Sequence, residues 1–173
     1  MDRARESLKR TVQAFLAIGR LIRIENLFTF AQFIFGYALA KGFSLGPEDG
    51  MRIGTAFVIL GVLVYGGIYA LNDVVDAHLD ALNPSKKTRP IPAGRIRRST
   101  ALATSLILMV GGLAASAIAS DGKLFSMAVT FILINLFYTF SAKHIPYLDI
   151  LTNGTSHALR VLFGIQFAGG ALY

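Results

Sequence analysis

The chain has 173 residues, of which 54% are hydrophobic and only 16% are charged, and its mean hydropathy is +0.56. This balance favours a polytopic membrane protein over a soluble domain. The sequence contains no cysteine, which excludes disulfides, thiolate catalysis and cysteine-ligated metals. The net charge of +7 comes mainly from two basic segments, which are typical of cytoplasmic, lipid-facing flanks, and we expect no nucleic-acid partner.

The first basic segment covers residues 1–23. Charges interrupt its apolar positions, and no small-residue cleavage site follows it. The pattern predicts a basic amphipathic helix at the membrane surface rather than a signal peptide. Residues 24–173 then form a membrane helical domain.

Five apolar runs approach the length needed to cross a bilayer core of about 30 Å. They predict an all-α integral membrane bundle of about five transmembrane helices, near residues 27–45, 53–71, 101–119, 124–140 and 148–173. Residues 46–50 and 120–123 have the composition of short turns. The last run reaches Tyr173 without a polar tail, so we expect a truncation, a partial gene model or one piece of a larger bundle.

The second basic segment, Asn83 to Arg98, holds six Lys or Arg residues and three prolines, and six more Lys or Arg residues precede residue 24. Because cytoplasmic loops are enriched in Lys and Arg, the N-terminus and this loop are both predicted to be cytoplasmic. The intervening acidic motif would then lie at the cytoplasmic mouth of the second helix.

That acidic motif is the strongest chemical signal in the chain. At about 100° per residue on a helix, Asn72, Asp73, Asp76 and Asp80 fall within about 100° of arc and face one way. Carboxylates so close together repel each other unless a cation joins them, and Mg²⁺ is the cation that commonly links carboxylates to phosphates. The alternative is an ordinary solvated helix end, neutralised by Lys86 or Arg89.

The following loop runs Lys86-Lys87-Thr88-Arg89-Pro90-Ile91-Pro92-Ala93-Gly94-Arg95. Its prolines stiffen the backbone, and arginine offers a planar fork that matches phosphate oxygens. Carboxylates, Mg²⁺ and cationic forks together indicate a diphosphate clamp. If the loop served only to fix the orientation of the protein in the membrane, its positive charge would be explained, but the order of its residues would not.

Motif and loop together read Asn72-Asp73-x-x-Asp76-x-x-x-Asp80, then Asn83-Pro84-x-Lys86-x-x-Arg89-Pro90-Ile91-Pro92-Ala93-Gly94-Arg95. This order resembles the first signature of the UbiA family of intramembrane prenyltransferases. Arg23 and Asn26 are similar to that family's entry to its first helix, although Ile24 replaces a proline. The run Tyr138-Thr139-x-x-Ala142-Lys143 resembles the end of its fourth helix.

The resemblance implies a nine-helix bundle around a lateral, lipid-open cavity, in which two Asp-rich motifs hold Mg²⁺ on an isoprenoid diphosphate. It covers almost all of this chain but only about the first half to three-fifths of a family member. After Asp80 the only acidic residues are Asp121 and Asp149, so the second motif is absent from this sequence.

From the motif and the resemblance we expect Asp73, Asp76 and Asp80 to bind Mg²⁺ and to be catalytic. The residues expected to bind the diphosphate are Asn72, Lys86, Arg89, Tyr138, Lys143 and Asn26. The expected reaction moves an isoprenoid chain from its diphosphate to a lipophilic or aromatic acceptor within the membrane. The metal and the cationic side chains would stabilise the charge that builds on the leaving diphosphate.

Two alternatives stay open. Asp149, the Asn83-Pro84-x-Lys86 loop and Arg160-Val161-Leu162-x-Gly164 resemble the branch that transfers a phosphoribosyl group to polyprenyl phosphate. Arg160 has a second interpretation, as half of a structural ion pair with Asp149. An alternative of another class is a cation-binding transporter subunit, since carboxylates within membranes also mark ion pathways. A dense cationic loop beside the carboxylates favours the diphosphate enzyme.

Overall fold

The computed structural model describes residues 6, 12, 15–119 and 122–169, and every regular element in these residues is a helix, which confirms the all-α prediction. Residues 15–21 are helical, while most of the predicted N-terminal segment lies outside the described residues. The elements that follow are η1 (Ile24–Phe30), α2 (Ala31–Ala40), α3 (Pro47–Ala56), η2 (Phe57–Tyr65), α4 (Gly66–Leu82), α5 (Arg98–Ala119), α6 (Lys123–Phe140), η3 (Ala142–His144) and α7 (Pro146–Phe167).

The elements α3, η2 and α4 form one continuous helix of 36 residues, Pro47–Leu82, whose middle part η2 is a π-helix. The helix begins at Pro47, because proline suits the first helical position and the Gly46 N–H donates to Asp49 Oδ2 at 2.9 Å. The turn predicted at residues 46–50 is therefore wrong. The chain instead turns before Gly46, where Gly42 and Phe43 have φ angles of 58° and 59°.

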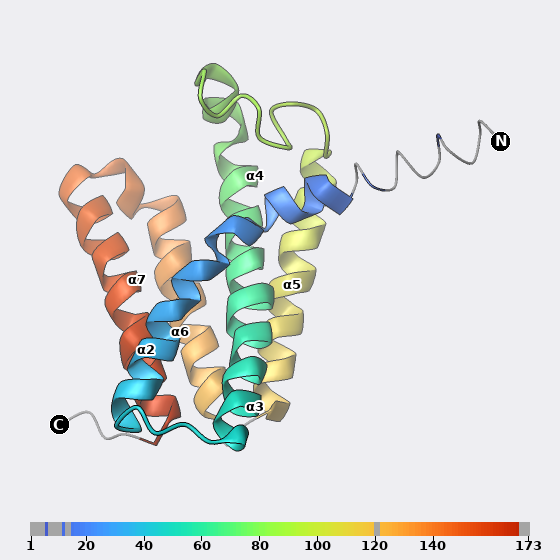
Figure 1. Ribbon diagram of the computed structural model, residues 1–173. Helices are drawn as coiled ribbons and strands as arrows, with labels where there is room; N and C mark the ends of the chain where they lie inside the picture. Colours follow the sequence, from blue (N-terminus) through green and yellow to red (C-terminus); the bar gives the residue numbers. More distant parts are fainter. Residues whose placement is uncertain (1–5, 7–11, 13–14, 120–121, 170–173) are drawn as a thin grey trace.

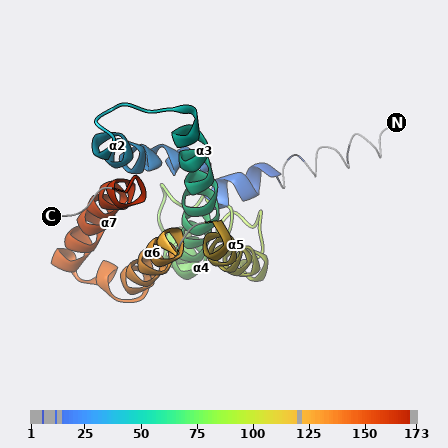
Figure 2. The same ribbon diagram turned by 90° about the horizontal axis from the view of Figure 1, so that it is seen from below.

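The long helix lies at the centre of the molecule, with α5 and α6 packed on it (Figures 1 and 2). To one side α2 and α7 run in the same direction and pack closely on each other. A Cβ atom added to Gly36 would lie 2.0 Å from the Val161 carbonyl oxygen, and one added to Gly164 would lie 2.0 Å from the Phe33 oxygen. The two glycines therefore permit a contact of backbone on backbone, as small residues do between membrane helices.

Three helices are long and apolar enough to cross a membrane: Pro47–Leu82, Arg98–Ala119 and Lys123–His144. They include three of the five apolar runs predicted from the sequence. The outer side of α5 exposes Ile107, Val110 and Ile118, a surface that suits contact with lipid. Helix α2 has 10 residues and α7 has 22, and neither belongs to the three candidate spans, so the count of five stays a prediction.

The two ends of the bundle differ in charge. The loop between α4 and α5 lies at the same end as the described N-terminal helix, and the loop between α2 and α3 lies at the other end (Figure 1). If the basic segments are cytoplasmic, as the sequence predicts, a cysteine replacing the exposed Ser85 will react with an impermeant maleimide only in permeabilised cells. Its matched control is Ser44→Cys at the opposite end, which is expected to react in intact cells. Labelling with the two sites exchanged would show that the orientation is inverted.

Candidate functional site

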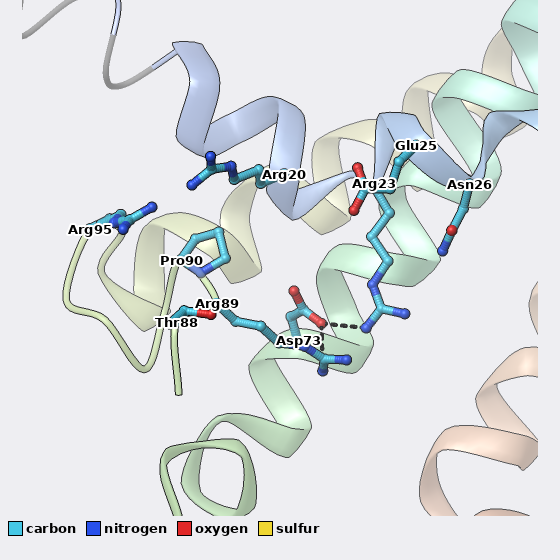
Figure 3. A pocket seen from close by; sticks show the side chains of 9 residues that line it. All are labelled: Arg20, Arg23, Glu25, Asn26, Asp73, Thr88, Arg89, Pro90 and Arg95. Atoms are coloured by element: carbon cyan, nitrogen blue, oxygen red, sulfur yellow. Dashed lines mark hydrogen bonds and ion pairs between the residues drawn. The ribbon is translucent and has the colours of Figure 1, made fainter. Parts of the chain in front are cut away.

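A cavity of about 410 Å³ opens at the end of the bundle where α4 finishes. It lies between the N-terminal helix with η1, the α4 helix and the loop that follows α4 (Figure 3). Its lining is strongly cationic and consists of Arg20, Arg23, Glu25, Asn26, Asp73, Thr88, Arg89, Pro90 and Arg95. Four arginines against two acids suit an anionic ligand.

The Asp73 carboxylate is the acidic centre of this cavity and is only 2% exposed. Its Oδ1 atom lies 2.7 Å from Arg23 Nη2 and 3.3 Å from Arg89 Nη1 (Figure 3). Arg89 Nη1 also lies 2.6 Å from Asp80 Oδ2, so one guanidinium nitrogen bridges two buried carboxylates. Lys86 Nζ approaches the other oxygen of Asp80 at 3.7 Å.

Arg23 reaches Asp73 from a special backbone position. The N-terminal helix ends just before it, and Arg23 itself has φ 52° and ψ 56° in the left-handed region, which costs about 1–2 kcal/mol for a residue with a Cβ atom. Such strain commonly persists where a side chain is needed in one place. Its guanidinium also lies over the Tyr69 ring, 5.3 Å from the centroid.

The remaining two polar residues of the motif face a different neighbour. Asn72 Oδ1 accepts a short hydrogen bond from the Thr139 hydroxyl of α6, and Asp76 forms a short ion pair with Lys143 of η3. On the helix, Asn72 and Asp76 differ by about 40° and Asp73 and Asp80 by about 20°. The predicted single face is therefore divided into one half against α6 and η3 and another half against Arg89.

The structure brings most of the predicted diphosphate residues to this end of the bundle. Asn26 lines the cavity, and its N–H donates to the Arg23 carbonyl at 2.7 Å. Lys86, Arg89 and Lys143 all pair with motif carboxylates. Tyr138 is half-buried on α6 and is not among the residues that line the cavity.

Sequence reasoning did not assign a site role to Arg20, Glu25 or Arg95, all of which line the cavity. For Arg20 no local pattern gave a signal, because its place in the cavity depends on the left-handed chain turn at Arg23. For Arg95 the signal was its place in the proline-rich loop.

Among the residues that the structure describes, no group of three or more His, Cys, Asp or Glu side chains is arranged as a metal site. The donor set nevertheless fits Mg²⁺, because Asp73 and Asp80 supply only oxygen ligands and already share one positively charged group. The assignment of Mg²⁺ to Asp73, Asp76 and Asp80 stays a prediction.

The sequence profile of the UbiA prenyltransferase family matches residues 29–172. The chain belongs to this family. The three apolar helices and the membership of the UbiA family together indicate an integral membrane protein. The cationic cavity and the carboxylate motif lie within or directly beside the matched residues.

Three UbiA-type relatives that are similar to this chain are named for different transfer reactions. The protoheme IX farnesyltransferase of Korarchaeum cryptofilum is 32% identical over 80% of this chain and 45% of that protein. The digeranylgeranylglyceryl phosphate synthase of Sulfurisphaera tokodaii is 30% identical over 86% of this chain and 51% of that protein. The decaprenyl-phosphate phosphoribosyltransferase of Corynebacterium glutamicum is 32% identical over 59% of this chain and 31% of that protein.

A solved structure described as giving structural and mechanistic insights into a digeranylgeranylglyceryl phosphate synthase in membranes shares this fold. The TM-score is 0.75 at 24% identity, over 87% of this chain and 52% of that one. The chain thus spans about half the length, or less, of the relatives named above.

Proposed function

We propose that this chain carries the diphosphate-binding and Mg²⁺-binding site of an intramembrane prenyltransferase, which moves an isoprenoid chain from its diphosphate to a lipophilic acceptor. The observation that carries the proposal is the cavity in which Arg20, Arg23, Arg89 and Arg95 surround the buried Asp73. A diphosphate with Mg²⁺ needs both components: cationic forks for its oxygens and carboxylates for the metal.

The ion pairs of the site would let its arginines exchange a carboxylate partner for a phosphate oxygen when the ligand binds. Arg23 and Arg89 are neutralised by Asp73, and Arg89 also by Asp80. With Mg²⁺ held by the carboxylates, the two guanidiniums would be free to donate to phosphate oxygens, and the charges inside the cavity would stay balanced. Bound Mg²⁺, held by Asp73, Asp76 and Asp80, would stabilise the charge that develops on the leaving diphosphate.

The other predicted residues have supporting tasks in this proposal. Lys143 would pass from Asp76 to a phosphate oxygen, and Asn72 would orient the diphosphate while Thr139 fixes its amide. Asn26 lines the cavity and Lys86 approaches Asp80, so both would add contacts to the diphosphate, and Tyr138 would approach from α6. The bond between the prenyl C1 carbon and the diphosphate oxygen breaks with its electron pair going to the diphosphate, C1 then bonds to the acceptor atom, and the proton that this atom carried is released.

A second candidate is the transfer of a phosphoribosyl group from its diphosphate to polyprenyl phosphate. The match to a decaprenyl-phosphate phosphoribosyltransferase and the Asn83-Pro84-x-Lys86 loop favour it. The same cavity would hold the diphosphate in both reactions. A cation transporter is disfavoured, since four arginines in the lining would repel its cargo.

The test measures transfer of a radiolabelled isoprenoid group from farnesyl or geranylgeranyl diphosphate to a panel of aromatic and glycerol-phosphate acceptors. The protein is assayed in lipid vesicles with Mg²⁺. Because this sequence carries one Asp-rich motif where the family resemblance implies two, we expect little or no transfer by this chain alone, and transfer that is lost in Asp80→Asn by a version extended through any downstream coding sequence. Phosphoribosyl diphosphate with polyprenyl phosphate is run beside it. Transfer of the phosphoribosyl group alone would establish the second candidate, and a signal that is equal in Asp80→Asn would contradict both.

A further inference from the structure

The described N-terminal helix, residues 15–21, leaves the bundle sideways. It lies across the long axis of α4 and α5, at the end of the bundle that carries the loop between them (Figure 1). Seen from below, the same segment leads outward from the bundle (Figure 2). The left-handed backbone of Arg23 makes this change of direction at the junction with η1. A helix placed in this way runs along the surface of the membrane that α5 and α6 would cross.

One side of this helix holds it to the bundle. Leu21 is fully buried, and Ala17 is 4% exposed. Leu21 packs with Ala70 and Val74 of α4 and with Ala101 of α5. At about 100° per residue, Ala17 and Leu21 lie about 40° apart and form the inner face of the helix.

The opposite side of the helix is apolar as well, and it is open. Phe15 is 78% exposed and Leu16 is 60% exposed, and with Gly19 they fall within about 100° of arc, opposite Leu21. A surface helix of a soluble protein needs only the one apolar face that it packs on the core. The second face borders an apolar groove of about 450 Å³, whose apolar lining consists of Val12, Phe15, Leu16, Gly19 and Ile24.

The surroundings of the apolar groove are basic. Arg20 and Glu25 complete its lining, and residues 1–23 carry six Lys or Arg residues against Asp2 and Glu6. Basic residues beside an apolar helix face are typical of a helix that binds an anionic leaflet. A second copy of the chain is a poorer partner for this face, because it would bring a further net charge of +7 to the contact.

We infer that the apolar groove and the open face of the N-terminal helix dock on the anionic leaflet at this end of the bundle. Phe15 and Leu16 enter the boundary between headgroups and acyl chains, and the basic side chains attract the lipid phosphates. The inference goes beyond the proposed function and does not depend on it, since it concerns the outside of the bundle. Arg20 and Glu25 line both the groove and the cavity, so the docked helix brings the cavity mouth to the level of the headgroups.

The test uses tryptophan fluorescence, because the chain has no tryptophan of its own. Phe15→Trp places one on the open face, and the purified chain is reconstituted in phosphatidylcholine vesicles with and without added phosphatidylglycerol. Lipids brominated on their acyl chains are expected to quench the emission at least about twofold more strongly with phosphatidylglycerol, and about 1 M NaCl to remove this difference. The control is Phe43→Trp, an exposed position at the opposite end, where quenching should not depend on lipid charge.

Two results would overturn the inference. The first is equal quenching of the Phe15→Trp chain with and without phosphatidylglycerol. The second is quenching that falls as the protein-to-lipid ratio rises, which would assign the open face to a second copy of the chain.

Variants on the two faces of the helix separate docking from folding. Leu16→Ser, made in the Phe15→Trp chain, should reduce quenching by the brominated lipid without lowering the thermal midpoint in a nonionic detergent, because Leu16 is mostly exposed. Leu21→Ser should lower the midpoint, since it leaves a cavity and a hydroxyl among Ala70, Val74 and Ala101. If Leu16→Ser lowers the midpoint as much as Leu21→Ser, the face is covered by protein and the inference is wrong.

Discussion

Replacing Asp73 by asparagine is expected to reduce the Mg²⁺-dependent affinity for an isoprenoid diphosphate by at least about 100-fold, since a buried charge-assisted contact to the ligand complex is lost. Asp73 is the carboxylate on which Arg23 and Arg89 converge. The side chains of these two arginines are 23% and 26% exposed, so they can turn to water, and the variant should stay folded. The measurement is equilibrium binding of labelled farnesyl diphosphate to the detergent-solubilised variant.

The matched control is Asp49→Asn at the opposite end of the bundle. Asp49 is also buried and accepts from the Tyr37 hydroxyl and the Gly46 N–H, and it pairs with Lys41 at 3.2 Å. Because these contacts join α2 to α3, Asp49→Asn should lower the thermal midpoint and leave diphosphate affinity unchanged. Equal affinity losses in the two variants would show that Asp73 acts through the fold rather than through the ligand.

Replacing Gly164 by alanine is expected to destabilise the protein strongly, as is the same change at Gly36. Its Cβ atom would lie 2.0 Å from the Phe33 oxygen and 2.7 Å from the Tyr37 nitrogen, and both are backbone atoms that no rotamer change can move. Overpacking of this kind costs about 1–3 kcal/mol, and alanine recovers about 1 kcal/mol of helix propensity. Because the clash is with backbone, we expect an overpacking cost near the upper value and a net loss of about 2 kcal/mol, measured as a lower unfolding midpoint in mixed micelles.

Gly154→Ala provides the comparison within the same helix, because a Cβ atom there meets nothing within 4 Å. It should leave the midpoint unchanged or raise it, by the propensity difference alone. If Gly164→Ala is as stable as Gly154→Ala, the close approach of α2 and α7 is not part of the folded protein.

Hydropathy predicted much of the fold because membrane helices must satisfy their own backbone, so long apolar runs can form little else. The helix boundary at Pro47 was not predicted, since Gly-Pro-Glu-Asp-Gly suits a turn as well as a helix start. The packing of α2 on α7 was also beyond the sequence pattern. Gly36 and Gly164 become meaningful only when the two helices are known to be neighbours.

The carboxylate motif and the loop arginines were predictable because their spacing suits one kind of chemistry, the binding of a diphosphate together with Mg²⁺. The division of the motif was not, because it depends on which helix stands opposite: Thr139 and Lys143 face Asn72 and Asp76, and Arg89 faces Asp73 and Asp80. Arg20 belongs to the cavity through a chain turn at Arg23 that no local pattern predicts.

The most direct test of the central claim is whether the wild-type chain needs Mg²⁺ to bind a prenyl diphosphate. Labelled farnesyl diphosphate is titrated onto the purified chain with Mg²⁺ and then with the metal removed by chelation, while dodecyl phosphate serves as the control anion. The proposed site predicts tight binding of the diphosphate with Mg²⁺ and at least about tenfold weaker binding without it, because the carboxylates then stay paired with Arg23 and Arg89. Equal binding with and without Mg²⁺ would contradict the proposal.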